Sequence, residues 1–326
     1  MMEFMNLYFL SFMTGGFGAW FLMKYGARMG INDIPNYRSS HRKAIPKGGG
    51  VGILLVLVMV CLIFSISISF WLPALIIALI SLWGGDKHRL TPKERLVIQF
   101  GCSLAFLAFW GYPKVFSFIS VLLCVPLSVF IVGTANFYNF MDGIDGIAGV
   151  TGVVGFSLLS FYSYVFGIEG PYGILCIALA FSCLGFLCFN MPGARVFLGD
   201  VGSILLGFVF ACLMIVLSEN VIDFMVMAGF LATFYFDEFF TMVIRIRNGD
   251  SLIKPHRKHI YQLLVNELSV PHWKIALLYG AIQLAIGLTV IYVRSMGLFY
   301  LFVLYVTYCL IFALISIKIH KKVVMQ

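Results

Sequence analysis

The chain has 326 residues, of which 61% are hydrophobic and 11% are charged, and its formal net charge is +8. Its mean hydropathy is +1.01, whereas soluble domains are roughly half apolar and about a quarter charged. This composition excludes a soluble globular protein. The apolar runs, such as VGILLVLVMVCLIFSISISF, are continuous rather than alternating. They therefore predict membrane-spanning helices and not the strands of a β-barrel.

We expect an all-α polytopic membrane protein, a single domain over residues 1–326 with about eleven transmembrane helices. The predicted spans cover residues 4–23, 49–70, 72–84, 97–111, 115–135, 147–166, 172–190, 202–218, 222–244, 275–293 and 297–317. The first run lacks a basic segment before it and is followed by Lys24 and Arg28. It is therefore predicted to be a retained span rather than a signal peptide.

The basic residues predict the orientation in the membrane. All of the Lys and Arg except Lys114 and Arg294 fall in connections on one side of the predicted spans. The positive-inside rule makes that side the cytoplasm, so the N-terminus lies outside and the C-terminus inside. The net charge is then a topology signal, and we expect no nucleic-acid partner. The cysteines lie in apolar runs without a CxxC pair, so we expect neither disulfides nor zinc.

Two of the cytoplasmic connections carry candidate residues near the N-terminal half. Residues 33–52 combine basic residues, including Lys47, with Gly48, Gly49, Gly50 and Gly52. This stretch is either a solvated positive loop or an anion site whose backbone approaches a neighbour closely. In WGGDKHRLTPKERLVIQ, Asp86 follows the third span and is a helix cap, a partner for Lys87 or a metal ligand. Thr91 or Pro92 is predicted to open the next helix, with Glu94 in its first turn.

The stretch TANFYNFMDGIDG, residues 134–146, places a polar group on every third residue. These groups are Asn136, Asn139, Asp142 and Asp145. In an unbroken α-helix three residues turn the chain by about 300°, so all four can converge only if the helix tightens or breaks. Gly143 permits a break. We therefore expect the fifth span to end near Asn139 and the acids to fold back over it, where amides and carboxylates suit a hydrated divalent cation.

Two further acidic positions follow. In FLGDVGS, residues 197–203, Asp200 lies between Gly199 and Gly202 at the start of an apolar helix, as a cap or as a carboxylate beside a phosphate site. Asp237 and Glu238 lie inside the ninth predicted span, where ionisable groups are usually functional or paired, and we favour Asp237 for function.

The last candidate segment is RIRNGDSLIKPHRKHIYQ, residues 245–262. His256 and His259 are three residues apart and can share a helical face, and Pro255 can occupy a first helical position. Because Arg257 and Lys258 lie between them, an anionic ligand fits this loop better than a metal. Carboxylates, cations, glycine-rich backbone and an apolar body meeting at one surface match the needs of phosphoryl transfer to a lipid.

Three stretches resemble one enzyme superfamily, namely TANFYNFMDGIDGIAG, FLGDVGS and PHRKHIYQ. They are similar to the polyprenyl-phosphate N-acetylhexosamine-1-phosphate transferases, which belong to glycosyltransferase family 4 of the lipid-linked sugar-phosphate transferases. The resemblance covers nearly the whole chain. DIPNYRSSH…PKGGG and PHRKHIYQ look most like the branch that initiates O-antigen and related surface glycans, and the three-histidine motif of the peptidoglycan branch is not matched.

The resemblance implies a reaction. A polyprenyl (undecaprenyl) phosphate oxygen attacks the β-phosphorus of a UDP-N-acetylhexosamine, and UMP leaves. The cofactor is Mg²⁺, with Mn²⁺ as an alternative ion. By the same resemblance Asp200 is a metal ligand, Asp142 and Asp145 lie around the metal and nucleotide, His256 and His259 lie near the diphosphate, and Asn139 shapes the site. We expect Asp200 and Asp142 to hold the metal and Asp86 and Asp145 to complete the catalytic acids. The expected substrate-binding residues are Lys47, Asn136, Asn139, Gly199, Asp237, His256, Arg257 and His259.

This sequence departs from the family at one position. The family has two adjacent aspartates after the third span, and here Gly85 stands in place of the first. We expect an active enzyme of the inner (cytoplasmic) membrane, with its site on the cytoplasmic face. A transporter of lipid or sugar and an inactive paralogue remain alternatives, and a homodimer is left open.

Overall fold

The computed structural model of the chain describes residues 2–35, 40, 43–83, 90–111, 118–168, 170–251 and 256–324. In these ranges the only strands form one short antiparallel pair, β1 (Asn32–Asp33) with β2 (Ile45–Pro46), and the rest of the regular structure is helical. The helical elements are α1 (Met2–Tyr25), α2 (Val51–Ile63), α3 (Ile68–Trp83), α4 (Pro92–Phe106), the π-helical η1 (Leu107–Gly111), α5 (Phe118–Phe140), α6 (Ile147–Val165), α7 (Tyr172–Asn190), α8 (Asp200–Leu217), α9 (Val221–Ala228), the 3-10 helix η2 (Gly229–Leu231), α10 (Ala232–Arg247), α11 (Ile260–Asn266), α12 (His272–Val293), η3 (Arg294–Met296) and α13 (Leu298–Val324).

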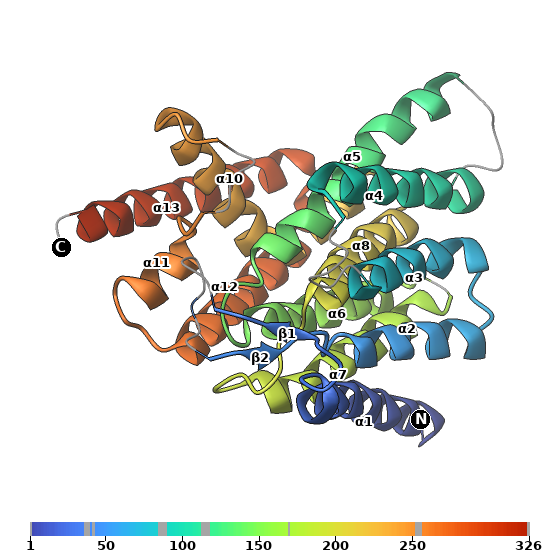
Figure 1. Cartoon of the computed structure of the whole chain (residues 1–326). Coiled ribbons are helices and arrows are strands. Elements are labelled where there is room, and N and C mark those ends of the chain that lie inside the picture. The colour runs from blue at the N-terminus through green and yellow to red at the C-terminus, as the bar shows by residue number, and fades with distance from the viewer. Residues whose placement is uncertain are drawn as a thin grey trace.

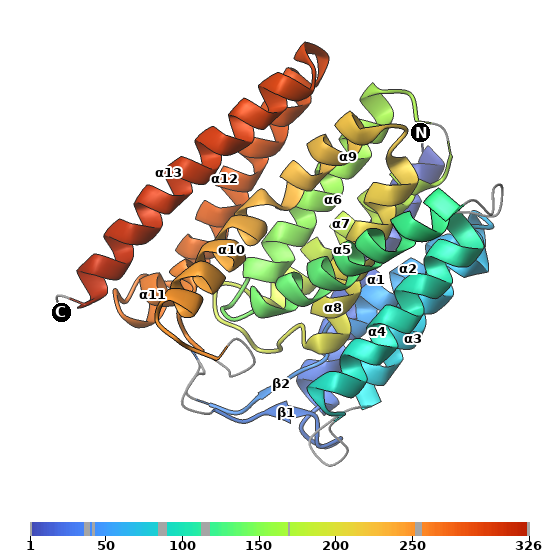
Figure 2. The same ribbon diagram turned by 90° about the horizontal axis from the view of Figure 1, so that it is seen from above.

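The helices have the lengths and composition of a polytopic membrane protein. Each of the eleven predicted spans overlaps a helix or a continuous helical run. Among the described residues, 7 helical runs are long and apolar enough to cross a membrane, and α2 and α3 are shorter apolar helices. The two chain ends lie at opposite ends of the bundle (Figures 1 and 2), as an odd number of crossings predicts. The all-α polytopic class is therefore confirmed.

One predicted boundary is wrong. The second span was expected over residues 49–70, but α2 ends at Ile63 and α3 begins at Ile68. Ser65 takes a left-handed conformation, with φ of 51°, and the Ile66 N–H donates to the Cys61 carbonyl at 2.8 Å. This is the closing bond of a left-handed helix terminus. The apolar run continues through the turn, so hydropathy gave no sign of it.

The ninth span is a broken helix rather than a continuous one. The α9 helix passes through η2 into α10 at Gly229–Leu231, and backbone groups freed at such a break need partners inside the membrane. Gln283 of α12 supplies them, because its Nε2 donates to the Gly229 carbonyl at 2.7 Å and its Oε1 accepts from the Thr233 N–H at 3.0 Å. The side chain of Gln283 is fully buried.

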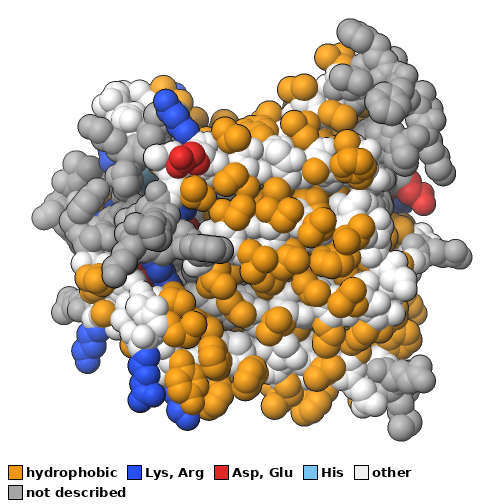
Figure 3. Space-filling view, turned by 45° about the vertical axis from the view of Figure 1, so that its right-hand side comes forward, with side chains coloured by type: hydrophobic (Ala, Val, Ile, Leu, Met, Phe, Trp, Pro, Cys, Tyr) orange, Lys and Arg blue, Asp and Glu red, His pale blue; other side chains and the backbone are white. Residues whose placement is uncertain are grey.

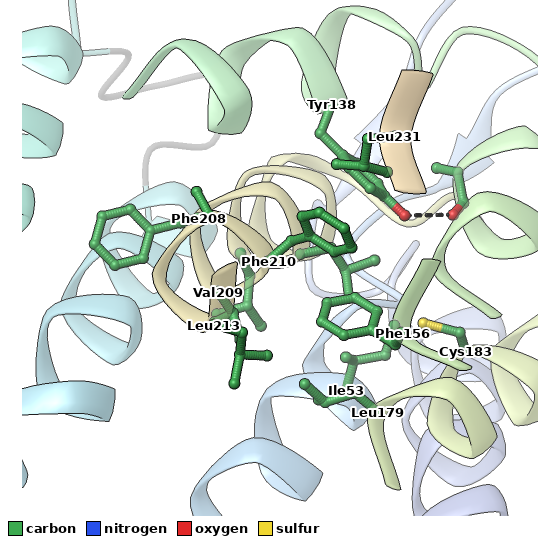
Figure 4. Close-up of a cluster of buried hydrophobic side chains, with 14 of the residues drawn as sticks. Ile53, Tyr138, Phe156, Leu179, Cys183, Phe208, Val209, Phe210, Leu213 and Leu231 are labelled. Atoms are coloured by element: carbon green, nitrogen blue, oxygen red, sulfur yellow. Dashed lines mark hydrogen bonds between the residues drawn. The ribbon is translucent and has the colours of Figure 1, made fainter. Parts of the chain in front are cut away.

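The α8 helix forms the centre of the bundle. It packs against α5 and α3, and its side chains meet those of α2, α6 and α7 in the cluster of Figure 4. Phe210 crosses Phe156 of α6 edge-on at 5.5 Å between ring centroids. In the same cluster the Tyr138 hydroxyl of α5 donates to the Ala148 carbonyl at 2.7 Å. Burial of this apolar surface fixes α5 and α6 relative to α8.

The outside of the bundle is also apolar. Hydrophobic side chains cover most of the face drawn in Figure 3, and Lys and Arg gather toward its left edge. On α13 the exposed side chains include Phe302, Leu310 and Leu314. An apolar exterior with charges at the rim is the surface that a lipid bilayer surrounds.

Candidate active site

The two acids of TANFYNFMDGIDG lie in a turn between two helices, as predicted. The α5 helix ends at Phe140 and α6 begins at Ile147, and we call residues 141–146 the acidic turn. The turn ends at Gly146, whose φ of +87° favours glycine. The Gly146 N–H donates to Asn190 Oδ1 at 2.7 Å, and Asn190 Nδ2 donates to the Val196 carbonyl at 2.9 Å. A buried amide at the end of α7 therefore holds the acidic turn against the chain that precedes α8.

The start of α8 lies directly beside the end of α5. Asp200 is the first residue of α8, as expected, and Gly199 before it has a φ of +71°. One turn into α8, the Ser203 hydroxyl donates to Asn139 Oδ1 at 2.7 Å. Asn139 precedes Asp142 by three residues, and Ser203 follows Asp200 by three. The bond therefore brings the two acidic segments to the same end of the bundle.

The glycine-rich stretch after β2 does approach a neighbouring backbone closely, and that neighbour is the FLGDVGS segment, residues 197–203. The Gly49 and Gly50 N–H groups donate to the Phe197 and Leu198 carbonyls at 2.9 and 3.0 Å. A Cβ on Gly50 would lie 2.3 Å from the Gly202 Cα, so any side chain would force the segments apart. Lys47 forms a parallel bridge with Phe197, which fixes the Lys47 backbone next to this segment.

Asp142 lies close to the other two acids of the site. Burial, together with the carboxylates of Asp200 and Asp145, raises the pKa of Asp142 to about 7. Asp200 accepts from Arg95 of α4 at 2.6 Å, and this pair is about one-third exposed. Asp145 Oδ2 accepts from the Ala194 N–H at 3.1 Å and lies 3.4 Å from His272 Nδ1, at the start of α12.

The two amides of the motif point to different neighbours, which corrects the expectation that all four polar groups converge. Asn136 Nδ2 donates to Gln99 Oε1 of α4 at 2.6 Å and to the Val132 carbonyl at 2.7 Å. Gln99 is buried. Arg95 and Gln99 are four residues apart and share one face of α4. Asn136 therefore ties α5 to α4, whereas Asn139 ties α5 to α8.

The histidines of the basic loop, residues 256–259, occupy different environments. His256 is partly exposed, whereas His259 is 2% exposed. Burial, with His259, Arg245 and Lys258 nearby, lowers the pKa of His256 to about 4. Arg257 lies 3.3 Å from Glu267, and Lys258 pairs with Asp250. The cations of the loop thus already have acidic partners.

The helix after the basic loop begins later than predicted. His259 is its N-cap and Ile260 its first residue, so the two histidines do not share a helical face. The reason is Asp237 of α10, which accepts from the Ile260 and Tyr261 N–H groups at 3.0 and 3.4 Å.

Asp237 itself is not at a surface. It is 0% exposed and also accepts from the Tyr279 hydroxyl at 2.6 Å. We therefore correct its predicted role, because a saturated and fully buried carboxylate supports α11 and has no surface to offer a substrate. His259 is buried as well, which leaves His256 as the histidine of the loop with an accessible ring.

The structure thus brings together Asp142, Asp145, Asp200, Asn139, Gly199 and the backbone of Lys47. Asp86 and Gly85 lie outside the described residues. Four residues of this neighbourhood carried no distinctive sequence signal, namely Arg95, Gln99, Asn190 and His272. Arg95 and His272 resembled ordinary cytoplasmic charges, and Gln99 and Asn190 could have been found only by asking why an amide stands in an apolar helix.

The donor atoms fit a hard divalent cation in kind. Mg²⁺ prefers oxygen ligands, and proteins usually hold it through one or two carboxylates while waters and substrate phosphates complete the shell. Asp142 and Asp200 offer such carboxylates. Burial, and then the neighbouring carboxylates, raise the pKa of Asp142, and a bound cation would favour its charged form. Among the described residues no group of three or more His, Cys, Asp or Glu forms a ready-made cage. The donor set therefore suits an ion that arrives with a phosphate ligand.

Together these features define a polytopic helical membrane protein with acidic and basic groups gathered at one end of its helices. The family model described as "Glycosyl transferase family 4" matches residues 67–218, which include the acidic turn and the FLGDVGS segment. Similar curated proteins include the phospho-N-acetylmuramoyl-pentapeptide-transferases of Staphylococcus aureus strains MSSA476 and MW2. Each is 26% identical over an alignment of 283 residues, and the match covers 76% of this chain and 85% of the relative. The matches support the assignment of this chain to the polyprenyl-phosphate sugar-phosphate transferase superfamily.

Proposed function

We propose that this protein transfers an N-acetylhexosamine-1-phosphate from a UDP-sugar to polyprenyl phosphate on the cytoplasmic face of the inner membrane, and releases UMP. The observation that carries the proposal is the hydrogen bond from Ser203 to Asn139. It joins the end of α5, directly before the acidic turn, to the FLGDVGS segment, at the end of the bundle where α1 finishes and the basic loop lies.

Each group has a task in this reaction. When Mg²⁺ is bound, it neutralises the diphosphate, and Asp142 and Asp200 are the residues that would hold it. Asn139 and Ser203 keep those two acids on adjacent helix ends. Gly199 lets the Gly48 backbone approach the start of α8, and His256 offers a neutral ring on the basic loop. The apolar exterior admits a lipid acceptor from the bilayer.

The acceptor phosphate needs no strong base. A phosphate monoester has a second pKa near 6, so it is mostly dianionic at neutral pH. The chain can therefore act with Gly85 in place of an aspartate, and Asp86 is left to position the metal or the lipid phosphate. Catalysis then rests on position and electrostatics rather than on proton transfer.

Two observations favour different donor sugars. PHRKHIYQ favours a UDP-N-acetylhexosamine and a role in initiating O-antigen or a related surface glycan. The names of the similar staphylococcal proteins point instead to a phospho-N-acetylmuramoyl-pentapeptide. We favour the N-acetylhexosamine. The peptidoglycan branch has a three-histidine motif, whereas the described residues of the basic loop supply only one accessible histidine.

The test is a screen of donors with purified protein, polyprenyl phosphate and Mg²⁺. UDP-GlcNAc, other UDP-N-acetylhexosamines and UDP-MurNAc-pentapeptide are compared by UMP release. We expect release with an N-acetylhexosamine donor and none with the pentapeptide donor. Release with the pentapeptide alone would reject the proposed donor class. Uptake of UDP-sugar into vesicles without UMP release would make the chain a transporter.

A further inference from the structure

Two acids stand side by side in the buried part of α10. Asp237 is 0% exposed and Glu238 is 2% exposed, and both lie in a helical run apolar enough to span a membrane. A buried carboxylate without a partner is strongly destabilising. The proposed reaction uses neither acid directly, so the presence of two buried carboxylates in α10 needs a physical reason.

His259 lies between the two carboxylates. Its Nδ1 is 3.4 Å from Asp237 Oδ1, and its Nε2 is 3.4 Å from Glu238 Oε2. Each ring nitrogen of His259 therefore faces one of the two carboxylates. We call these three residues the acid–imidazole clasp.

The clasp is connected to the acidic turn through α11. Asp237 accepts from the Ile260 and Tyr261 N–H groups, and the Tyr261 hydroxyl donates to the Phe140 carbonyl at 2.9 Å. A Cβ on Gly143 would lie 2.2 Å from that hydroxyl, so Tyr261 lies directly against the acidic turn.

The clasp also lies next to His256, the accessible histidine of the basic loop. The His256 and His259 rings lie 4.9 Å apart between centroids. Any displacement of His259 from between the two acids would therefore move His256 as well.

We propose that Asp237 and Glu238 are positioning residues, which hold His259 so that the basic loop and Tyr261 stay docked on the acidic turn, and which thereby control the affinity for the UDP-sugar. The inference rests on the proposed function, since it assigns these residues to donor binding. Neither acid touches the substrate. They set the fraction of molecules in which the loop is ready to bind.

The first test is Asp237→Asn in the full-length protein. If the loop is docked in about a tenth of the variant molecules, the apparent KM for the UDP-sugar rises about tenfold, because apparent affinity falls with the competent fraction. The kcat should stay close to that of the wild type, since bound donor docks the loop again. Hydrogen exchange should quicken at Ile260 and Tyr261 while α8 stays protected.

The matched control is Asp223→Asn. Asp223 is also buried and pairs with Arg294 at 2.7 Å, but it lies on α9 near the outer end of the same helical run. A purely structural loss reduces the amount of active protein, which lowers the apparent kcat and leaves KM unchanged. We expect that pattern for Asp223→Asn. The same pattern in Asp237→Asn would overturn the inference.

A second variant serves if Asp237→Asn does not fold. Tyr261→Phe keeps the ring and removes only the bond to Phe140, and we expect a higher KM with faster exchange in the acidic turn. An unchanged KM would overturn the inference. Hydrogen exchange can be measured without turnover. A wild type that is inert with every donor would reject the proposed function. The hydrogen exchange of residues 256–266 in Asp237→Asn would still decide whether the clasp docks the loop.

Discussion

The Ser203 hydroxyl donates to the side-chain oxygen of Asn139 at 2.7 Å, across 64 residues of sequence. Each partner lies three residues from an acid, Asp200 in one case and Asp142 in the other. The bond therefore sets the spacing between an acid of the acidic turn and the acid that begins α8, and its loss should change chemistry as well as stability.

Ser203→Ala should lower both turnover and stability. The substitution leaves the buried side of Asn139 without its donor, which typically costs about 1–3 kcal/mol. Thermal unfolding in detergent and UMP release measure the two effects. The matched control is Ser218→Ala at the far end of α8, where the hydroxyl donates only to the Met214 carbonyl of its own helix, at 2.6 Å. Equal turnover in the two variants would contradict the role assigned to the Ser203 bond.

Arg95→Ala should let Mg²⁺ bind at a lower concentration. In the structure Arg95 Nη1 lies 2.6 Å from Asp200 Oδ2, so Mg²⁺ must compete with this guanidinium for the carboxylate. The pair is about one-third exposed, so an interaction of roughly 0.2–1 kcal/mol predicts an affinity gain of only about 1.4- to 5-fold. The readout is the Mg²⁺ concentration that half-saturates the rise in Tm, which does not depend on activity.

Lys93→Ala is the control for charge in the Mg²⁺ titration. It removes the same charge from the same helix at an exposed position. If Arg95→Ala and Lys93→Ala shift the titration equally, general electrostatics explains the effect, and the specific competition at Asp200 is wrong.

Acidification should destabilise the protein through His256. Its pKa is lowered from 6.5 to about 4, chiefly by burial. Between these values the unfolded chain binds a proton that the folded chain does not, so the free energy of unfolding falls as the pH drops from 6.5 toward 4. The difference in Tm between wild type and His256→Gln should therefore shift against the wild type from pH 7.5 to pH 5. A difference that is constant over this range would show that His256 titrates normally.

Gly85→Asp should leave kcat close to the wild-type value. The acceptor phosphate is already mostly dianionic at neutral pH, so a second acid beside Asp86 has no proton to remove. The comparison is UMP release by the two proteins at pH 7.5 and equal Mg²⁺. An inert wild type that gains activity from this one substitution would show that the missing aspartate is required.

Most of the fold could be predicted because a bilayer accepts few structures. Apolar runs of about 20 residues must become helices whose backbone groups are satisfied internally, and composition alone reveals them. The turn at Ser65 could not be predicted, since residues on both sides of it are equally apolar. The break at Gly229 was also missed, because the side chain that makes it tolerable, Gln283, lies 50 residues or more away from its partners.

Some residues of the site could also be predicted from the sequence, and others could not. Asp142, Asp145 and Asp200 could be found locally, from acids and glycines at the ends of apolar runs. Arg95 could not be found in this way, because its partner Asp200 is 105 residues away in the sequence. A basic residue beside a span normally indicates only the orientation of the protein in the membrane. For Asp237 the position in the membrane indicated importance, but only the contacts with α11 identified the kind of role.

The central claim is that acids from the acidic turn and the FLGDVGS segment serve one transfer reaction. The most direct test is UMP release from a UDP-N-acetylhexosamine by wild type, Asp142→Asn and Asp200→Asn. We predict release by the wild type only when both polyprenyl phosphate and Mg²⁺ are present, and none by either variant although both remain folded. Wild-type rates from either variant, or release that needs no lipid phosphate, would contradict the account.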